Sequence, residues 1–172
     1  IYSELNEQLD LYKMAMSIIC TIRGIPQIYY GTEIAMSSSG DHGELRKDFP
    51  GGWPDDEKDA FTGYGLNKIE LEAQSYLKRL LNWRKGNLAI AKGDLVHYPV
   101  RDNVYVYFRN YQKNLVMVIV NNSERAKTVY PNQYNEIIKG RTKGVNIIND
   151  RLHYLLREIN ISGKSTMILE IH

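Results

Sequence analysis

The sequence contains little cysteine and no long apolar run. Its one cysteine, Cys20, excludes an internal disulfide and any zinc site built from four cysteines. Cys20 lies among apolar residues on a helical pattern, which is typical of a small buried side chain. No window approaches the roughly 18 apolar residues that a membrane span needs. The sequence therefore predicts neither a disulfide framework nor a membrane segment.

An excess of charge of one sign is also absent. The 22 Lys and Arg residues nearly balance the 20 Asp and Glu residues, and the formal net charge is +2. So small a charge does not favour a nucleic acid or a membrane surface as partner. With 172 residues, the chain can bury one ordinary core or two small ones. It has no signal-peptide pattern and begins at Ile1, so we expect the native N-terminus to have been removed from a longer protein.

The first half of the chain begins with an amphipathic pattern. Apolar residues over 5–19 recur at spacings of four and three, which predicts a helix with one buried stripe. Gly24 and Pro26 form a stop signal for that helix. The apolar stretch Gln27–Tyr30 then predicts a short strand, covered on both faces as in a parallel sheet.

A long segment without periodicity follows at 31–66. It is rich in Gly, Ser, Asp and Pro, with several aromatic residues, and loops of this length in compact domains are usually functional or disordered. Asn67 and Glu70 have the spacing of a capping box, which begins a helix that ends at Gly86. The first 86 residues are thus predicted to run helix, strand, long loop, helix.

The pattern changes to short β-rich runs at about residue 87. Residues 104–108 and 115–120 predict two strands joined by a hairpin loop at 110–114. Further predicted strands are Leu95–Tyr98, Lys127–Tyr130, Val145–Ile148, His153–Leu156 and Thr166–Ile171. Short strands at this spacing, without helices between them, predict an antiparallel β-sandwich at 87–172 as a second domain.

The predicted strand at 27–30 needs neighbours. A buried strand without a partner leaves its backbone N–H and C=O groups unpaired. The economical explanation places partner strands upstream of Ile1, in a chain of βα units. In a (β/α)8 barrel the active site is built at the carboxyl ends of the strands, where the loop 31–66 would lie.

The decapeptide GIPQIYYGTE at 24–33 resembles the last barrel strand of the α-amylase superfamily of glycoside hydrolases. The matching positions are Gly24, Pro26, Tyr29, Tyr30, Gly31 and Glu33. The segment 80–93 resembles the final barrel helix of that family, and 87–172 resembles its C-terminal domain. The segment 41–53 is similar to enzymes of the neopullulanase and cyclomaltodextrinase type.

The resemblance implies a fold and a function. Residues 1–86 would be the last segment of a (β/α)8 barrel, and the parent protein a retaining hydrolase of α-1,4-glucans. The catalytic carboxylates of the family would lie upstream, so no catalytic residue is assigned and the chain alone is expected to be inactive. No cofactor is expected in this chain, although the parent would be able to bind calcium. Resemblance favours a periplasmic or extracellular protein, and the unpaired strand suggests a homo-oligomer.

Four loop residues are predicted to bind substrate: Arg46, Asp48, Phe49 and Trp53. Sugars are bound by charged and amide groups and by aromatic rings that stack on their apolar faces. By resemblance, Arg46 is the best candidate for a direct contact; alternatively it is a solvated arginine or forms an ion pair with Asp41 or Asp48. Trp53 is either a stacking platform or part of a small core of the loop.

Tyr29, Tyr30 and Glu33 are assigned mainly structural roles. Adjacent strand residues face opposite ways, so one tyrosine is expected to point into the barrel and the other toward the helices. For Glu33, a carboxylate that accepts hydrogen bonds from loop N–H groups is favoured over a substrate contact.

Metal binding is not favoured anywhere in the chain. His42 has no second histidine in the loop and no ligand spacing. The acidic run at 55–59 lacks the alternating ligands and central glycine of a calcium loop, so a solvated turn is expected.

Two other classes of protein stay open. The β-sandwich could be a non-catalytic sugar-binding or structural module. The chain could also come from a non-catalytic α-amylase-like protein, such as the heavy chain of an amino-acid transporter. The loop residues 46–53, which suit a substrate, favour the hydrolase.

Overall fold

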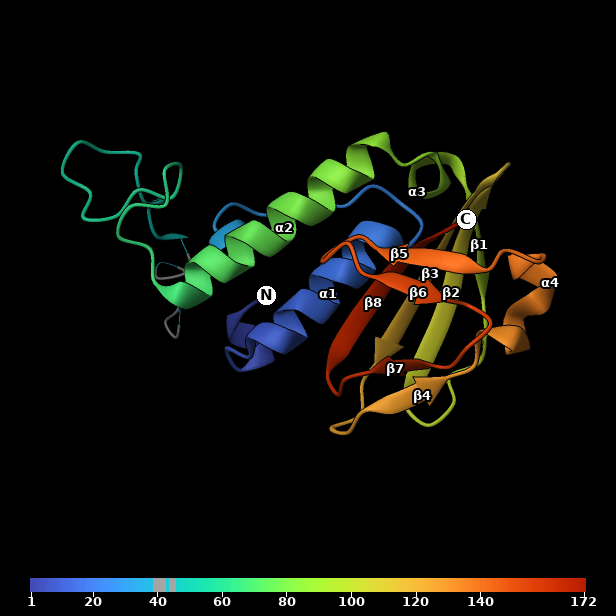
Figure 1. Cartoon of the computed structure of the whole chain (residues 1–172). Helices are drawn as coiled ribbons and strands as arrows, with labels where there is room; N and C mark the ends of the chain where they lie inside the picture. Colours follow the sequence, from blue (N-terminus) through green and yellow to red (C-terminus); the bar gives the residue numbers. More distant parts are fainter. Residues whose placement is uncertain (39–42, 44–45) are drawn as a thin grey trace.

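The structure, a computed structural model, describes residues 1–38, 43 and 46–172 (Figure 1). Within these residues no helix combines the length and apolar character needed to cross a membrane. The elements before the sheet are η1 (Ser3–Leu5), α1 (Leu9–Thr21), η2 (Thr32–Ile34), α2 (Lys68–Gly86) and α3 (Leu88–Lys92). Those that follow are β1 (Asp94–His97), β2 (Val104–Tyr111), β3 (Asn114–Asn121), β4 (Lys127–Val129), η4 (Pro131–Tyr134), α4 (Asn135–Ile138), β5 (Lys143–Asn146), β6 (Leu152–Tyr154), β7 (Ile159–Ile161) and β8 (Ser165–Ile171).

The strands form one large sheet and one small ribbon. The large sheet has the order β1-β2-β3-β8-β5-β6, and every neighbouring pair is antiparallel. The strands β4 and β7 pair separately, also antiparallel. The predicted antiparallel sheet is therefore confirmed, while β7 was not predicted. The hairpin between β2 and β3 is tighter than expected, because the strands reach Tyr111 and Asn114.

The large sheet is buried on both faces. Along β3, alternate side chains enter two different cores, as the two-residue period of a strand requires. Val116, Val118 and Val120 pack with residues of α1 and α2, whereas Leu115, Met117 and Ile119 pack with residues of β4, β7 and α4. In Figure 1, α1 and α2 run side by side. The β-rich part of the chain is thus a sheet with helices on one face and the β4–β7 ribbon on the other.

Two arginines fix the C-terminal end of α1. The guanidinium of Arg84 donates to the carbonyl oxygens of Cys20 (2.8 Å) and Gly24 (3.1 Å). Arg109, on β2, donates to the carbonyl oxygen of Thr21 at 2.9 Å. The last carbonyls of a helix lack intrahelical partners and carry partial negative charge, so cations stabilise this end. These bonds attach α1 to α2 and to the sheet.

The helix α2 begins as the sequence predicts. The side chain of Asn67 accepts a hydrogen bond from Glu70 N (3.0 Å), and the Glu70 carboxylate accepts one from Asn67 N (2.7 Å). This reciprocal pair is the predicted capping box. The helix ends at Gly86, also as predicted.

The predicted strand at Gln27–Tyr30 is not formed. Residues 25–29 carry no regular secondary structure, and Ile25 is 96% exposed. A strand exists only when a neighbour pairs with its backbone, and no described segment lies in that position. The expected opposite orientation of Tyr29 and Tyr30 is also wrong, because their ring centroids lie 4.6 Å apart.

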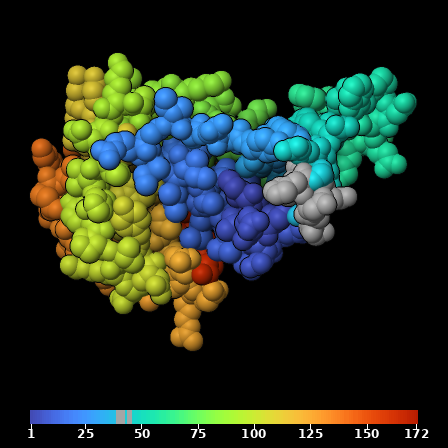
Figure 2. Space-filling model, turned by 180° about the vertical axis from the view of Figure 1, so that it is seen from behind, coloured from blue at the N-terminus to red at the C-terminus, as the bar shows by residue number. Residues whose placement is uncertain are grey.

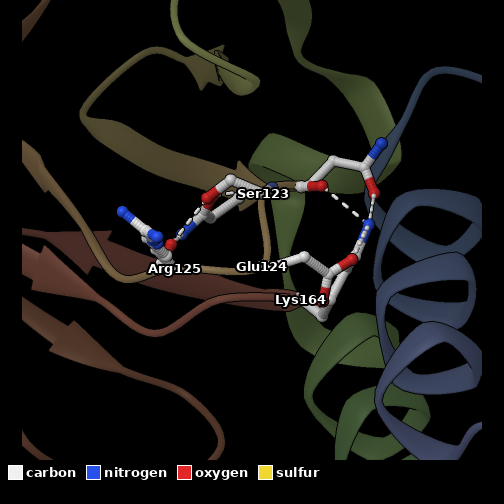
Figure 3. Close-up of polar contacts among 6 residues, drawn as sticks. Ser123, Glu124, Arg125 and Lys164 are labelled. Atoms are coloured by element: carbon white, nitrogen blue, oxygen red, sulfur yellow. Dashed lines mark hydrogen bonds and ion pairs between the residues drawn. The ribbon is translucent and has the colours of Figure 1, made fainter.

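Polar contacts join the β3–β4 connection to the β7–β8 turn (Figure 3). Lys164 donates to the carbonyl oxygen of Asn122 at 2.8 Å and forms an ion pair of 3.3 Å with Glu124. Within the same connection, the hydroxyl of Ser123 donates to the carbonyl oxygen of Arg125 at 2.6 Å. These contacts hold the β4–β7 ribbon against the large sheet, which is a structural role.

Candidate functional site

The segment 31–66 begins at a glycine that the backbone requires. Gly31 has φ +80°, and a Cβ atom there would lie 2.4 Å from the sulfur of Met36. Its carbonyl oxygen accepts a hydrogen bond from Met36 N at 2.9 Å, which closes a tight turn around η2. The hydroxyl of Tyr12 donates to the carbonyl oxygen of Thr32 at 2.8 Å. The start of the segment is therefore fixed to α1.

The segment has a small core of its own. Ile34, Ala60 and Leu66 are buried together, and Met36 and Phe49 pack against them. The amide of Gln74 on α2 donates to the carbonyl oxygen of Ala60 at 2.6 Å. Phe49, a predicted substrate residue, is thus half-buried as part of this core, and its ring contacts Phe61 in an edge-to-face geometry at 5.3 Å.

The acidic run at 55–59 supports the backbone of the loop. The Asp56 carboxylate accepts hydrogen bonds from Gly51 N (2.7 Å) and Trp53 N (3.0 Å). The Asp59 carboxylate accepts from Phe61 N at 2.8 Å and from the Thr62 hydroxyl at 2.8 Å. The bond from Thr62 is the main reason that the pKa of Asp59 is lowered from its ordinary value. These two carboxylates shape turns, in agreement with the expected role of the run.

Three aromatic side chains of the loop are exposed: Trp53 at 65%, Phe61 at 76% and Tyr64 at 72%. In the rear view of Figure 2, the teal segment that carries them projects from the body of the molecule. Trp53 therefore lies outside the small core, and one of its two predicted alternatives, a role in packing the loop, does not describe its position. Exposed aromatic rings on a projecting loop are suited to stack on the apolar face of a ligand.

A second group forms around Tyr30. Its hydroxyl donates to the carbonyl oxygen of Lys47 at 3.1 Å. The pKa of Tyr30 is raised, first by desolvation, then by its neighbour Tyr29 and by the charge of Asp48, while Arg46 acts in the opposite direction. The charges of Arg46 and Asp48 therefore lie within electrostatic reach of this phenol. Tyr29, Tyr30 and Lys47 also help to line a cavity of about 230 Å³.

Arg46 and Asp48 are both exposed. No ion pair between them, nor any side-chain hydrogen bond of either, is found among the described residues. Asp41, the other alternative partner of Arg46, lies outside the described residues. The structure thus brings Arg46 and Asp48 close to Tyr30 and leaves their polar atoms accessible, but no described contact joins them to Trp53.

Glu33 lies near α1. Its negative charge contributes, after burial, to raising the pKa of Tyr12. No hydrogen bond of its carboxylate to loop N–H groups is found within the described part of the chain, so the role predicted for Glu33 stays a prediction.

The sequence also predicts that the chain does not favour metal binding. Among the described residues, no group of three or more His, Cys, Asp or Glu side chains is arranged to hold a metal ion. His42 lies outside these residues.

Sequence reasoning did not select two of the exposed aromatic residues. Phe61 and Tyr64 flank Thr62 and Gly63 in the second half of the loop, where an antiparallel bridge joins Asp59 to Tyr64. The sequence signal that could have identified them is the high density of aromatic residues in a glycine-rich segment.

Comparison with known proteins gives consistent matches. Residues 95–170 match the family model described as "Cyclo-malto-dextrinase C-terminal domain". A cyclomaltodextrin glucanotransferase of Paenibacillus macerans is 34% identical over 119 residues, which are 69% of this chain and 14% of the relative. An alpha-amylase of Niallia circulans is 29% identical over 109 residues, 63% of this chain and 18% of the relative. The chain thus spans less than a fifth of the length of these relatives.

Solved structures share the fold. The crystal structure of an alpha-amylase from Geobacillus thermoleovorans, complexed with acarbose, superposes with a TM-score of 0.71 at 21% identity. The superposition covers 98% of this chain and 35% of that one. Both the helices and the sheet are therefore included in the shared fold.

Proposed function

Because this chain matches the C-terminal part of α-amylase family glycoside hydrolases, we propose that it completes a retaining α-glucan hydrolase. The parent would cleave α-1,4-glucosidic bonds of starch-like polysaccharides, as an α-amylase, neopullulanase or cyclomaltodextrinase. The observation that carries the proposal is the combined match of a C-terminal domain model at 95–170 and of relatives named cyclomaltodextrin glucanotransferase and alpha-amylase.

Residues 1–86 form, in this proposal, the last segment of a (β/α)8 barrel. The backbone at 25–28, which makes no hydrogen bond among the described residues, and the exposure of Ile25 support it, because neighbouring strands would pair with that backbone and cover Ile25. The segment 31–66 would then lie at the carboxyl end of the last strand, the side on which such barrels carry their active sites.

The catalytic carboxyl groups would come from elsewhere in the parent. Retaining glycosidases use two carboxyl groups roughly 5–5.5 Å apart, one as nucleophile and one as acid and base. The Asp56 and Asp59 carboxylates are occupied by the loop's own N–H and hydroxyl groups. Because the catalytic carboxyl groups are expected in another part of the parent, we expect the chain alone to be inactive.

The loop would supply one wall of the sugar site. Arg46 and Asp48 offer a donor and an acceptor next to Tyr30, and Trp53 offers an exposed ring. Phe49 would act indirectly, by holding the loop in shape from its small core. This division of roles follows from burial: exposed polar atoms and rings are available to a ligand, whereas a packed ring is not.

The test is glucan cleavage by the parent protein and by its Arg46→Ala variant. We expect the variant to lose about tenfold or more in kcat/KM on maltoheptaose, because a charge-assisted contact with substrate is removed. The matched control is Arg157→Ala, which removes an exposed arginine in the turn between β6 and β7. Product analysis should include cyclic glucans, since a glucanotransferase is among the relatives. An unchanged Arg46→Ala variant would remove Arg46 from the site, and a parent that cleaves no α-glucan would refute the function.

A further inference from the structure

A proline turn comes immediately before Trp53 in the loop. Its hydrogen bond runs from the amide of Gly52 to the carbonyl oxygen of Phe49, at 3.3 Å. Pro50 and Gly51 are the two central residues, and Gly51 has φ +96°, which is the pattern of a type II turn. Because proline fixes φ at one central position and glycine tolerates positive φ at the next, the sequence itself favours this turn.

A second proline turn begins at Trp53. The amide of Asp56 donates to the carbonyl oxygen of Trp53 at 3.3 Å, and Pro54 takes the second position of this turn. The side chain of Asp56 bonds to both turns, because its Oδ2 accepts hydrogen bonds from Gly51 N (2.7 Å) and Trp53 N (3.0 Å). One carboxylate oxygen therefore joins the two turns and fixes the backbone that carries the indole ring.

The first turn is attached to the rest of the loop. The amide of Ala60, a buried residue of the loop's small core, donates to the carbonyl oxygen of Pro50 at 3.0 Å. A Cβ atom on Gly51 would lie 2.5 Å from Oδ1 of Asp59, so this turn packs directly against the second half of the loop. The turn that precedes Trp53 is therefore a fixed support.

Asp56 differs in its contacts from the neighbouring Asp55. Asp56 is half-buried, whereas Asp55 is exposed and has no hydrogen bond or ion pair within the described part of the chain. The ring of Trp53 is 65% exposed, so it is held by its backbone and not by packing in the core. A ring on a fixed backbone loses less conformational entropy when it binds a ligand than a ring on a flexible one.

We propose that Asp56 is a positioning residue, which holds Trp53 as a preformed stacking platform for an α-glucan. The sugar rests on the proposed function, whereas the link between the two residues rests on the hydrogen bonds of Asp56 Oδ2. Asp56 acts through Trp53, without a contact of its own to the substrate.

The first test measures the mobility of the Trp53 ring in the chain 1–172. Trp83→Phe leaves Trp53 as the only tryptophan, so time-resolved fluorescence anisotropy reports on this ring alone. We expect Asp56→Ala to increase the fast, local part of the anisotropy decay, because both hydrogen bonds are lost. Asp56→Asn keeps an acceptor oxygen and should stay close to the unmodified chain. Asp55→Ala is the matched control and should leave the decay unchanged.

The second test is a double-mutant cycle on the parent protein, with maltoheptaose as substrate. We expect Asp56→Ala to raise KM about fivefold with kcat nearly unchanged, because a preformed platform is lost and the reacting groups are not touched. Trp53→Ala should raise KM about tenfold, in line with the loss of one stacking ring. Adding Asp56→Ala to Trp53→Ala should raise KM no further, because a residue that acts through Trp53 has no effect without it.

Three results would overturn the proposal: unchanged anisotropy in Asp56→Ala, an equal change in Asp55→Ala, or effects of Asp56→Ala and Trp53→Ala on KM that multiply in the double variant. The last result would show that Asp56 acts independently of Trp53. Failure of the proposed function is read separately. A parent that cleaves no α-glucan refutes the part of the inference that concerns the sugar, while the anisotropy decides whether Asp56 holds Trp53.

Discussion

The indole Nε1 of Trp83, on α2, donates a hydrogen bond of 2.8 Å to Oε1 of Glu170, on β8. The same oxygen accepts a hydrogen bond of 2.6 Å from the side chain of Asn87. One carboxylate of the last strand thus binds both the end of α2 and the residue that follows it. Tyr12 and Met16 of α1, Leu77 of α2 and strand residues lie in a single core, so the helices and the sheet are stabilised together.

Trp83→Phe removes this hydrogen bond and keeps most of the buried ring. We expect a loss of about 1 kcal/mol in the free energy of unfolding, the usual value for one partly buried bond. Urea denaturation measures it, with the exposed Asn82→Ala as control. A Trp83→Phe variant as stable as the unmodified chain would show that Glu170 is satisfied by Asn87 alone.

Substitution of Arg109 is expected to lower the free energy of unfolding more than Trp83→Phe does. Arg109 is only 2% exposed, and its guanidinium donates to the carbonyl oxygens of Thr21, Ile90 and Gly93. Arg109→Met leaves these three acceptors without this donor, so we expect a loss of at least about 3 kcal/mol in the free energy of unfolding, at about 1 kcal/mol or more for each unpaired buried group. Arg109→Lys should recover only part of it, because one ammonium cannot reproduce the planar fork. Equal stability of the lysine variant and the unmodified chain would contradict this.

His153 predicts a pH dependence of stability. Burial, and then the charge of Arg151, lower the pKa of His153 in the folded chain, and its Nε2 has no hydrogen-bond partner among the described residues. In the unfolded chain the ordinary pKa is about 6.5. Below that pH the unfolded state binds the proton more readily, so stability is lost as the pH falls from about 6.5 toward the folded pKa.

Urea midpoints at about pH 7.5 and about pH 5.5 measure this loss, since they bracket the ordinary pKa of histidine. His153→Gln should show a smaller difference between the two pH values, while the exposed His97→Gln should behave like the unmodified chain. If His153→Gln keeps the full pH dependence, other groups cause it.

Residues 25–29 form no strand, and the backbone of 25–28 makes no hydrogen bond among the described residues, which predicts self-association of the isolated chain. Ile25 and Tyr29 are exposed there at 96% and 61%, and an apolar segment with free backbone groups is able to pair with a second copy. Sedimentation velocity should show a dimer whose fraction rises with concentration, and Ile28→Pro should reduce it by removing an N–H donor and fixing φ. A monomer at every concentration would contradict this prediction.

The sequence predicts the sheet well because its strands carry their own signal. β2 and β3 are apolar over nearly their whole length, since both faces of the sheet are buried. By contrast, β7 has only three residues, Ile159–Ile161, with a polar residue between two apolar ones, too few for a period to be recognised. The strand expected at Gln27–Tyr30 failed for the opposite reason: its composition is right, but pairing depends on a neighbour.

The same dependence on local sequence decides which candidate site residues could be predicted. Arg46, Asp48 and Trp53 stand close together in the sequence, so one loop motif was enough to select them. The cavity between the β1–β2 connection, β4 and η4 was not predicted, because residues 98–104 and 127–134 meet only after β4 has paired with β7 and η4 has packed on Phe108. No local pattern encodes that meeting.

The most direct test of the account is the anomeric form of the first product that the parent protein releases from an α-1,4-glucan. Proton NMR during the first minutes distinguishes the two anomers before they equilibrate. A retaining α-glucan hydrolase releases the α-anomer first, and this is the result we predict, together with no release by the chain 1–172 alone. Initial release of the β-anomer, or no cleavage by the parent, would contradict the account.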